Sequence, residues 1–322
     1  MLIDPLVRAR ARLALGQLCR THLYDPNVTL IDIGHKATAG RVERDRLAVR
    51  VHVASKLTPV QLEVAAAGGA TAPVPRSIGG FETDVIEGRY RQRLRPGTGA
   101  SATSRRARFD PLRGGISVSR SGRYGAGTLG GIVLDRASGA PMLLSNWHVL
   151  VASWLARPGT AVFQPATTDG AAAADQVGRL ARDAMSVNLD AAVAWVDDSR
   201  SLSALQHQLG RVRGRAQPAH EMRVAKSGRT SGVTRGEISG TDGVMTLRYA
   251  GLTRQIRHVI TIEPADGADV LSAGGDSGSL FLDEASGACV ALHFAGGDFP
   301  ERALAIDINP VVDALGVEFD AG

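Results

Sequence analysis

One serine of this chain is surrounded in sequence by residues that are typical of a nucleophile. Ser277 lies in residues 274–278, Gly-Gly-Asp-Ser-Gly, and the apolar residues 280–282 follow directly. Glycines around a nucleophile let consecutive backbone N–H groups converge on one point, and a substrate carbonyl can then approach without meeting a Cβ atom. A turn between two strands is the better interpretation of these residues alone, because Gly, Asp and Ser are all common in turns. A catalytic interpretation therefore depends on residues elsewhere.

A histidine and an aspartate each adjoin an apolar run. His148 follows residues 142–144, and Asp190 precedes residues 191–196. A serine hydroxyl becomes an effective nucleophile when a base accepts its proton, and the base needs an acceptor behind it to hold the correct tautomer. Taken singly, His148 is better interpreted as a hydrogen-bonded strand-end histidine and Asp190 as a turn residue. Taken with Ser277, they predict an active site.

The order of these three residues distinguishes between folds. His, Asp, Ser is the chymotrypsin order, whereas subtilisins have Asp, His, Ser and α/β-hydrolases have Ser, Asp, His. Ser279 also stands where the nucleophile elbow of the hydrolases has its last glycine.

From residue 109 to the C-terminus the chain resembles the chymotrypsin/trypsin-like serine peptidases, in particular bacterial and plant members that are not secreted. The resemblance is carried by Gly275-Asp276-Ser277-Gly278, by residues 145–149 (Ser-Asn-Trp-His-Val), by residues 189–193 (Leu-Asp-Ala-Ala-Val), and by residues 226–232, which are similar to the α-lytic-type branch. It implies a mainly β chymotrypsin-like double β-barrel, here with a small N-terminal α+β domain.

The resemblance implies a serine endopeptidase that acts through an acyl-enzyme intermediate. Ser277 would attack the peptide carbonyl, His148 would act as general base and then general acid, and Asp190 would orient His148. The backbone N–H groups of Gly275 and Ser277 would form the oxyanion hole. Asp276 would pair with Lys226 or Arg229, so that the site needs no activating cut.

The resemblance also locates a substrate pocket. Leu271 stands where trypsins hold an aspartate, so a preference for Arg or Lys is not expected. Ser272 and His293 match positions that glutamate-preferring relatives use to hold an acidic side chain. An acidic preference is expected on that basis, with small apolar side chains as the alternative. A hydrogen-bonded strand histidine is an equally good interpretation of His293.

The charge and the motifs of the sequence limit which partners and cofactors are expected. The formal net charge is +5 and the isoelectric point is near 9.7. These values allow attraction to acidic partners or nucleic acid. The sequence has no nucleic-acid motif, so a solvated basic surface is the expected explanation and nucleic acid is not an expected partner. Neither a metal-ligand cluster nor a phosphate-binding glycine loop is evident, so no metal and no cofactor are expected.

The cysteines and the N-terminus predict a cytoplasmic protein. Cys19 and Cys289 are the only cysteines, and Ala225 stands where the α-lytic branch has one of its paired cysteines. This pattern fits a reducing compartment. The charged residues Asp4 and Arg8 interrupt any stretch of signal-peptide length. No run reaches the ~18 apolar residues of a membrane span.

Three segments are expected. Residues 1–88 predict an α+β domain with helices over 3–23 and 58–67 and strands over 28–33, 47–53 and 83–87, with His52 facing solvent. Residues 89–108, rich in arginine and glycine, predict a solvated linker. Residues 109–322 predict the peptidase domain, in which strands over 125–134 and 141–150 form a hairpin that ends near His148, and 308–317 form a closing helix.

Two other functions remain open. The chain could keep the scaffold as a latent or catalytically silent protein-binding module, with the N-terminal domain recruiting a partner protein. Alternatively, the arginine-rich residues 89–108 could contact RNA or DNA. The sequence does not indicate the natural substrate, the oligomeric state, or whether activity needs a trigger.

Overall fold

The fold consists mainly of β-strands. A computed structural model of the chain describes residues 3–38, 41–69, 71–92, 105–122, 125–265, 270–298 and 300–320. Four α-helices lie among these residues, namely α1 (Pro5–His22), α2 (Pro59–Ala67), α3 (Trp147–Leu150) and α4 (Ile308–Leu315). The strands are β1 (Val28–Thr38), β2 (Arg41–Val53), β3 (Ser77–Ile78), β4 (Phe81–Glu87), β5 (Arg91–Gln92), β6 (Leu112–Gly114), β7 (Ser117–Arg120), β8 (Gly127–Thr128), β9 (Gly131–Asp135), β10 (Pro141–Ser145), β11 (Ala161–Phe163), β12 (Gln176–Asp183), β13 (Ala192–Val196), β14 (Leu202–Gln206), β15 (Gly210–Arg211), β16 (Arg223–Gly228), β17 (Gly232–Tyr249), β18 (Leu252–Pro264), β19 (Leu280–Asp283), β20 (Cys289–Asp298), β21 (Glu301–Asp307) and β22 (Val317–Glu318).

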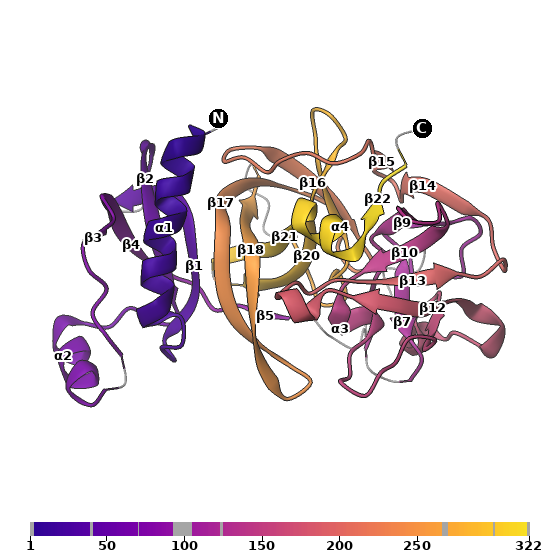
Figure 1. Cartoon of the computed structure of the whole chain (residues 1–322), viewed down its shortest axis with the longest axis horizontal. Coiled ribbons are helices and arrows are strands. Elements are labelled where there is room, and N and C mark those ends of the chain that lie inside the picture. The colour runs from indigo at the N-terminus through magenta and orange to yellow at the C-terminus, as the bar shows by residue number, and fades with distance from the viewer. Residues whose placement is uncertain are drawn as a thin grey trace.

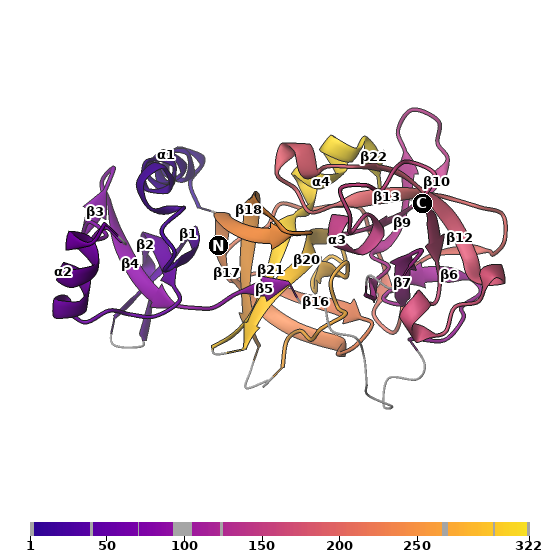
Figure 2. The same ribbon diagram turned by 90° about the horizontal axis from the view of Figure 1, so that it is seen from below.

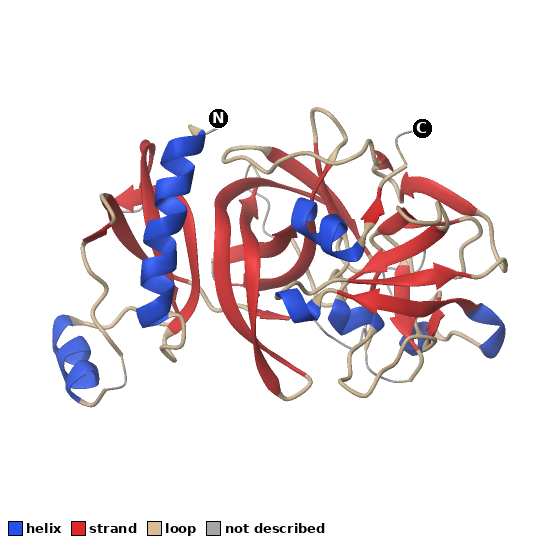
Figure 3. Cartoon of the chain, in the orientation of Figure 1, coloured by secondary structure: helices blue, strands red, loops and turns tan. Residues whose placement is uncertain are grey.

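Two curled sheets dominate the structure (Figures 1 and 3). One sheet has the order β22-β9-β10-β13-β12-β11-β7-β8. The other has the order β16-β19-β20-β21-β18-β17, and it closes on itself because β16 also pairs with β17. This confirms the mainly β, chymotrypsin-like double-barrel fold class, with an α+β unit at the N-terminus.

The long strand β17 joins three parts of the molecule. Its first part pairs with β16 and closes the second barrel, with Val224 opposite Gly236. Its middle pairs with β1 of the N-terminal unit, with Ile31 opposite Val244. Its last residue, Tyr249, is buried. The sheet of the N-terminal unit therefore continues directly into the second barrel (Figure 2).

The N-terminal unit is a four-stranded sheet covered on one face by α1 (Figure 1). The side chain of Asp4 caps this helix by accepting hydrogen bonds from the first-turn N–H groups of Leu6 and Val7. Ala14 and Leu18 of α1 pack in one apolar cluster with residues of β1 and β2. The predicted helix over residues 3–23 is therefore present as α1.

The opposite face of this sheet contains a buried charge network, which overturns the prediction that His52 faces solvent. His52 is 0% exposed because this face packs on the second barrel. Asp32 accepts two hydrogen bonds from Arg50, at 2.8 and 2.6 Å, and one from the Thr261 hydroxyl on β18 at 2.7 Å. His52 Nε2 lies 3.2 Å from Asp32 Oδ1, and its Nδ1 lies 2.6 Å from the Tyr90 hydroxyl.

Some element boundaries differ from those expected. The strand expected over residues 141–150 ends at Ser145, because α3 begins at Trp147 and contains His148. Residues 169–185 contain a short 3₁₀-helix, Ala173–Asp175, followed by strand β12.

Residues 93–104, the centre of the expected linker, lie outside the described residues. At its two ends, β5 pairs with β20, and Arg105 is buried with its guanidinium 2.5 Å from the Ser227 hydroxyl. These ends are part of the fold, and the domain boundaries stay a prediction.

In the described part of the chain, no helix combines the length and the apolar character needed to cross a membrane. The same part contains no group of three or more His, Cys, Asp or Glu side chains that could hold a metal ion.

The buried ion pair between the N-terminal sheet and the barrel can be tested by Asp32→Asn. Burial alone would raise the pKa of Asp32, but Arg50 and His52 outweigh it and hold the pKa below its ordinary value. Removing the carboxylate leaves Arg50 buried without its counter-ion, so we expect urea unfolding to show a loss of about 3–5 kcal/mol. The matched control Asp313→Asn, at the exposed ion pairs with Arg136 and Arg215, should cost at most about 1 kcal/mol.

The same comparison has a pH dependence. A carboxylate whose pKa is depressed in the folded state stabilises the fold at pH values above its unfolded-state pKa of ~3.9. This contribution is lost as the pH falls toward the folded-state pKa. The difference between wild type and Asp32→Asn should therefore be largest near neutral pH and shrink below pH ~4. A difference that is equal at all pH values would contradict the assignment.

Candidate active site

Neighbouring strands bring His148 and Asp190 together. β10 pairs with β13, with Ser145 opposite Ala192, so the residues just beyond this pair lie side by side. His148 Nδ1 is 2.5 Å from Asp190 Oδ2, and the backbone N–H of His148 donates to Asp190 Oδ1 at 3.1 Å. The Asn146 side chain donates to the Asp190 carbonyl at 2.7 Å. The imidazole is thereby held by Nδ1, while Nε2 has no hydrogen-bond partner among the described residues.

A tyrosine that the sequence analysis missed completes the surroundings of Asp190. Tyr249, the last residue of β17, donates its hydroxyl hydrogen bond to Asp190 Oδ2 at 2.9 Å and is 1% exposed. Burial, and then the charge of Asp190, raise the pKa of Tyr249 well above its ordinary value, so this hydroxyl stays a donor. No spacing or motif in the sequence relates Tyr249 to the candidate triad, because the contact is made between the two barrels.

Ser277 lies at the seam between the two barrels. Its carbonyl accepts a hydrogen bond from the N–H of Thr128 at 2.8 Å. A Cβ atom at Gly127 would fall within 3 Å of both Val149 and the Ser277 carbonyl, so β8 lies between the segments of the histidine and the serine. Within the described residues, the Ser277 hydroxyl donates to the Phe294 carbonyl at 3.2 Å and makes no hydrogen bond to His148. His148 is therefore in direct contact with Asp190, whereas the Ser277 hydroxyl is hydrogen-bonded to a different acceptor, the Phe294 carbonyl.

Two glycines of the serine loop have left-handed backbone conformations, with φ of 102° at Gly275 and 98° at Gly278. A Cβ atom at Gly278 would lie 2.1 Å from the Thr128 carbonyl, so no side chain fits there. The backbone N–H groups of Gly275 and Ser277 have no acceptor in the described part of the chain, whereas Asp276 N–H donates to Ala273. These two N–H groups are therefore available to a ligand oxygen.

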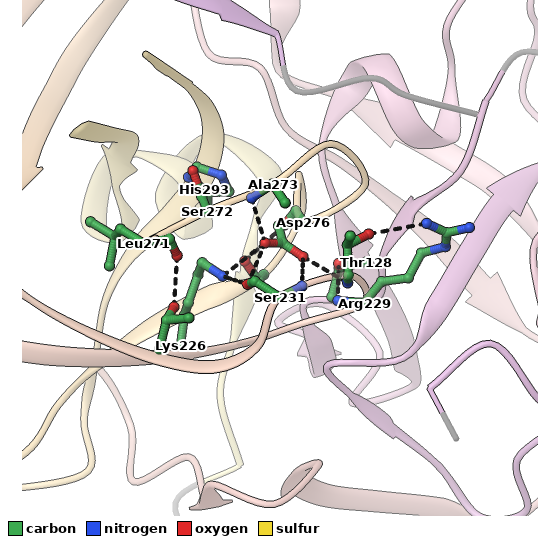
Figure 4. A network of polar contacts seen from close by, with 12 residues as sticks. Thr128, Lys226, Arg229, Ser231, Leu271, Ser272, Ala273, Asp276 and His293 are labelled. Carbon is green, nitrogen blue, oxygen red and sulfur yellow. Dashed lines mark hydrogen bonds and ion pairs between the residues drawn. The ribbon is translucent and has the colours of Figure 1, made fainter. Parts of the chain in front are cut away.

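A buried carboxylate fixes the loop from behind (Figure 4). Lys226 Nζ lies 3.0 Å from Asp276 Oδ2, and both side chains are 0% exposed. The same carboxylate accepts hydrogen bonds from the Ser231 hydroxyl and from the N–H groups of Ala273, Thr230 and Ser231. Burial would raise the pKa of Asp276, but these partners hold it well below its ordinary value.

Of the two cations expected at Asp276, the structure brings only Lys226 to the carboxylate. Arg229 instead forms a buried ion pair with Asp169, whose Oδ2 is 2.7 Å from Arg229 Nε. The reason is that Asp276 is already surrounded by donors, while Asp169 on the first barrel would otherwise be a buried charge. No motif in the sequence points to Asp169, which ends the short 3₁₀-helix Thr167–Asp169.

The three expected pocket residues are all buried. Leu271 packs in an apolar cluster that includes Ile238 and Phe281. The Nδ1 atom of His293 lies 3.1 Å from the Leu304 carbonyl.

A carboxylate that the sequence analysis did not foresee borders this group. Glu301 Oε1 accepts hydrogen bonds from the N–H groups of Leu271 and Ser272, each at 3.1 Å. It adds negative charge next to the expected pocket.

No protein-family model and no curated protein matches this sequence. The chain is similar in structure to Thermobifida fusca protease A, with 20% identity, a TM-score of 0.49, and coverage of 66% of this chain and 99% of that one. It is similar to a Nocardiopsis protease, with 19% identity, a TM-score of 0.49, and coverage of 65% and 99%. It is also similar to a Cellulomonas bogoriensis chymotrypsin, with 19% identity, a TM-score of 0.47, and coverage of 66% and 99%. At such identities and TM-scores, a functional assignment has to come from the residues of this chain.

Proposed function

We propose that this chain is a serine endopeptidase that hydrolyses peptide bonds through an acyl-enzyme intermediate, with Ser277 as the nucleophile. The observation that carries the proposal is the pair of His148 and Asp190. The carboxylate holds Nδ1 at 2.5 Å, and Nε2 has no partner among the described residues. An imidazole fixed in this way is a base available to a nearby hydroxyl group.

The reaction begins with a side-chain rotation. Ser277 Oγ leaves the Phe294 carbonyl and turns about its Cα–Cβ bond toward His148 Nε2, which is a change between staggered rotamers. The hydroxyl proton passes to Nε2 as Oγ bonds to the peptide carbonyl carbon. The resulting imidazolium is stabilised by Asp190, and the oxyanion receives hydrogen bonds from the N–H groups of Gly275 and Ser277.

The remaining steps regenerate the enzyme. The imidazolium of His148 gives its proton to the leaving amine, the carbon–nitrogen bond breaks, and an ester to Ser277 remains. Water then attacks the ester with His148 again as base, which releases the acid product and restores the serine hydroxyl.

The substrate we propose is a protein or peptide whose side chain before the cut enters a pocket lined by Leu271, Ser272 and His293. The carboxylate of Glu301 borders this pocket through its hydrogen bonds to Leu271 and Ser272. Negative charge at this place disfavours an acidic substrate side chain, so we propose a small apolar side chain before the cut.

A second candidate function rests on the position of the serine. Ser277 is 0% exposed, and its hydroxyl is bonded to Phe294 rather than to His148. A latent or silent scaffold that binds a partner protein would have these properties permanently, whereas a peptidase would have them only before activation.

The triad is tested by labelling and cleavage. We expect a serine-directed phosphonate to label the wild type but not Ser277→Ala, and a mixed peptide library to be cut by the wild type alone, as read by mass spectrometry. Asp190→Asn should lose turnover by about 10⁴-fold, because the histidine is then held in the wrong tautomer. Labelling of Ser277 without any cuts would show an activated serine and contradict the silent scaffold. The absence of both labelling and cuts would favour the latent or silent scaffold over the peptidase.

Tyr249→Phe tests the third donor to Asp190. A hydrogen bond to a charged group contributes about 1.5 kcal/mol or more, so kcat should fall roughly tenfold while KM stays the same. The control is Tyr24→Phe, because Tyr24 is 74% exposed in the N-terminal unit. Equal kcat for Tyr249→Phe and wild type would show that Asp190 needs only the histidine.

Lys226→Met tests the ion pair behind the serine loop. Leaving Asp276 buried without its cation should cost about 3–5 kcal/mol in thermal or urea unfolding and disrupt the loop that presents Ser277. Adding Asp276→Asn should restore part of the stability, because the uncompensated charge is removed. Arg229→Met acts through Asp169, so Asp276→Asn should not rescue it. A rescue of both, or of neither, would contradict the pairing.

A further inference from the structure

A short piece of the chain itself lies on the edge of β20 beside the candidate site. β5 pairs antiparallel with β20, with Gln92 opposite Ala295 and Arg91 opposite Gly296. On the edge of β20 that β5 uses, β19 pairs only as far as Leu292. On the opposite edge, β21 pairs with β20 along its length. Figure 2 shows β5 reaching this position from the N-terminal unit. The edge that would otherwise be free is therefore paired.

This edge continues directly from the serine loop. The His293 carbonyl accepts a hydrogen bond from Gly278 N–H at 2.9 Å, and the next carbonyl, that of Phe294, accepts the Ser277 hydroxyl at 3.2 Å. The pairing of β20 with β21 shifts between His293 and Ala295. Such a bulge changes which backbone groups face an edge, and bulges are common next to active sites. Residues 294–296 thus form the strand edge nearest to the nucleophile.

The direction of the paired segment is that of a substrate. A Cβ atom at Gly297 would lie 2.5 Å from the Arg89 carbonyl, so the segment starts against Gly297. It then runs past Gly296 to Ala295, toward the carbonyl that holds the Ser277 hydroxyl. A peptide in this orientation presents its C-terminal side to the nucleophile. Extended peptides commonly bind by adding a strand to a free sheet edge.

The segment is anchored upstream by the N-terminal unit and the barrel. The Tyr90 hydroxyl lies 2.6 Å from His52 Nδ1, and Arg89 Nε donates to the Ala54 carbonyl at 2.8 Å. Arg302 of β21 donates to the Glu87 carbonyl at 2.9 Å. These contacts hold residues 89–92 against β20 in a fixed register.

The exposure of the candidate catalytic side chains agrees with a blocked site. Ser277 is 0% exposed and His148 is 3% exposed. A nucleophile and base that act on a protein need an approach path, so their burial describes a state that a substrate does not enter.

We infer that residues 89–92 occupy the backbone-binding edge of the active site, so that the N-terminal unit holds the peptidase in a self-blocked state. This inference rests on the proposed function, because the edge matters as the place where the acyl side of a substrate pairs. A segment tethered in this way has an effective concentration on the order of millimolar. A separate peptide therefore competes poorly until the segment is displaced.

The test measures binding without catalysis. A fluorescein-labelled peptide with the sequence of residues 84–92 is titrated into Ser277→Ala and followed by fluorescence anisotropy. Two further substitutions displace the internal segment in that background. Gln92→Pro removes a backbone N–H from β5, and Tyr90→Ala removes its anchor on His52. The control is Tyr24→Ala, the same change at an exposed tyrosine of the same unit.

We expect the peptide to bind about tenfold or more tightly to the two displaced variants than to the parent and the control, because competition in cis is lost. With Ser277 intact, the same two substitutions should speed labelling by a serine-directed phosphonate by about the same factor. Thermal unfolding establishes that each variant is folded. If Tyr90→Ala is not folded, the result for Gln92→Pro alone decides the test.

The outcomes separate the two proposals. Equal binding, or no binding, in all variants overturns the self-blocked state, while labelling and peptide cleavage by the wild type would leave the peptidase intact. Tighter binding to the displaced variants without labelling or cleavage by any protein would support the occupied edge and refute the peptidase. Tighter binding with faster labelling supports both.

Discussion

The candidate site depends on how one buried carboxylate, that of Asp190, is neutralised. It is 0% exposed, and a carboxylate in that position is costly unless several donors surround it. Two donors come from His148 in the first barrel and one from Tyr249 in the second. The two barrels must therefore meet at a fixed distance for this charge to be stable. The requirement that orients the imidazole thus also fixes the packing of the barrels.

The same principle recurs away from the site. Asp276 with Lys226 holds the serine loop, Asp169 with Arg229 joins a loop of the first barrel to the second, and Asp32 with Arg50 lies under the N-terminal sheet. Buried pairs contribute little net stability compared with apolar packing, but breaking one is strongly unfavourable. Each pair therefore acts mainly to select one arrangement of segments. In a chain with only 4% aromatic residues, these pairs supply specificity that large side chains often give.

Much of the fold could be predicted from the sequence, and less of the site. Helix α1 and the strand-rich second half follow from periodicity and glycine-rich turns, which are local signals. His148, Asp190 and Ser277 were selected by residue type and order, and the structure brings the first two into contact. Tyr249 and Asp169 could not be found in this way, because each acts through a contact between distant segments. His52 was misjudged for the same reason, since its strand faces the barrel and not solvent.

The contacts of β17 with β16, with β1 and, through Tyr249, with Asp190 have a consequence for how this chain can change. Side chains alternate along a strand, so a one-residue slip moves every following side chain to the other face. Between Val244, opposite Ile31, and Tyr249, bonded to Asp190, the strand has no loop to absorb a length change. An insertion or deletion there would separate the attachment of the N-terminal unit from the hydroxyl at the triad. Substitutions can accumulate in this stretch, but its length is fixed.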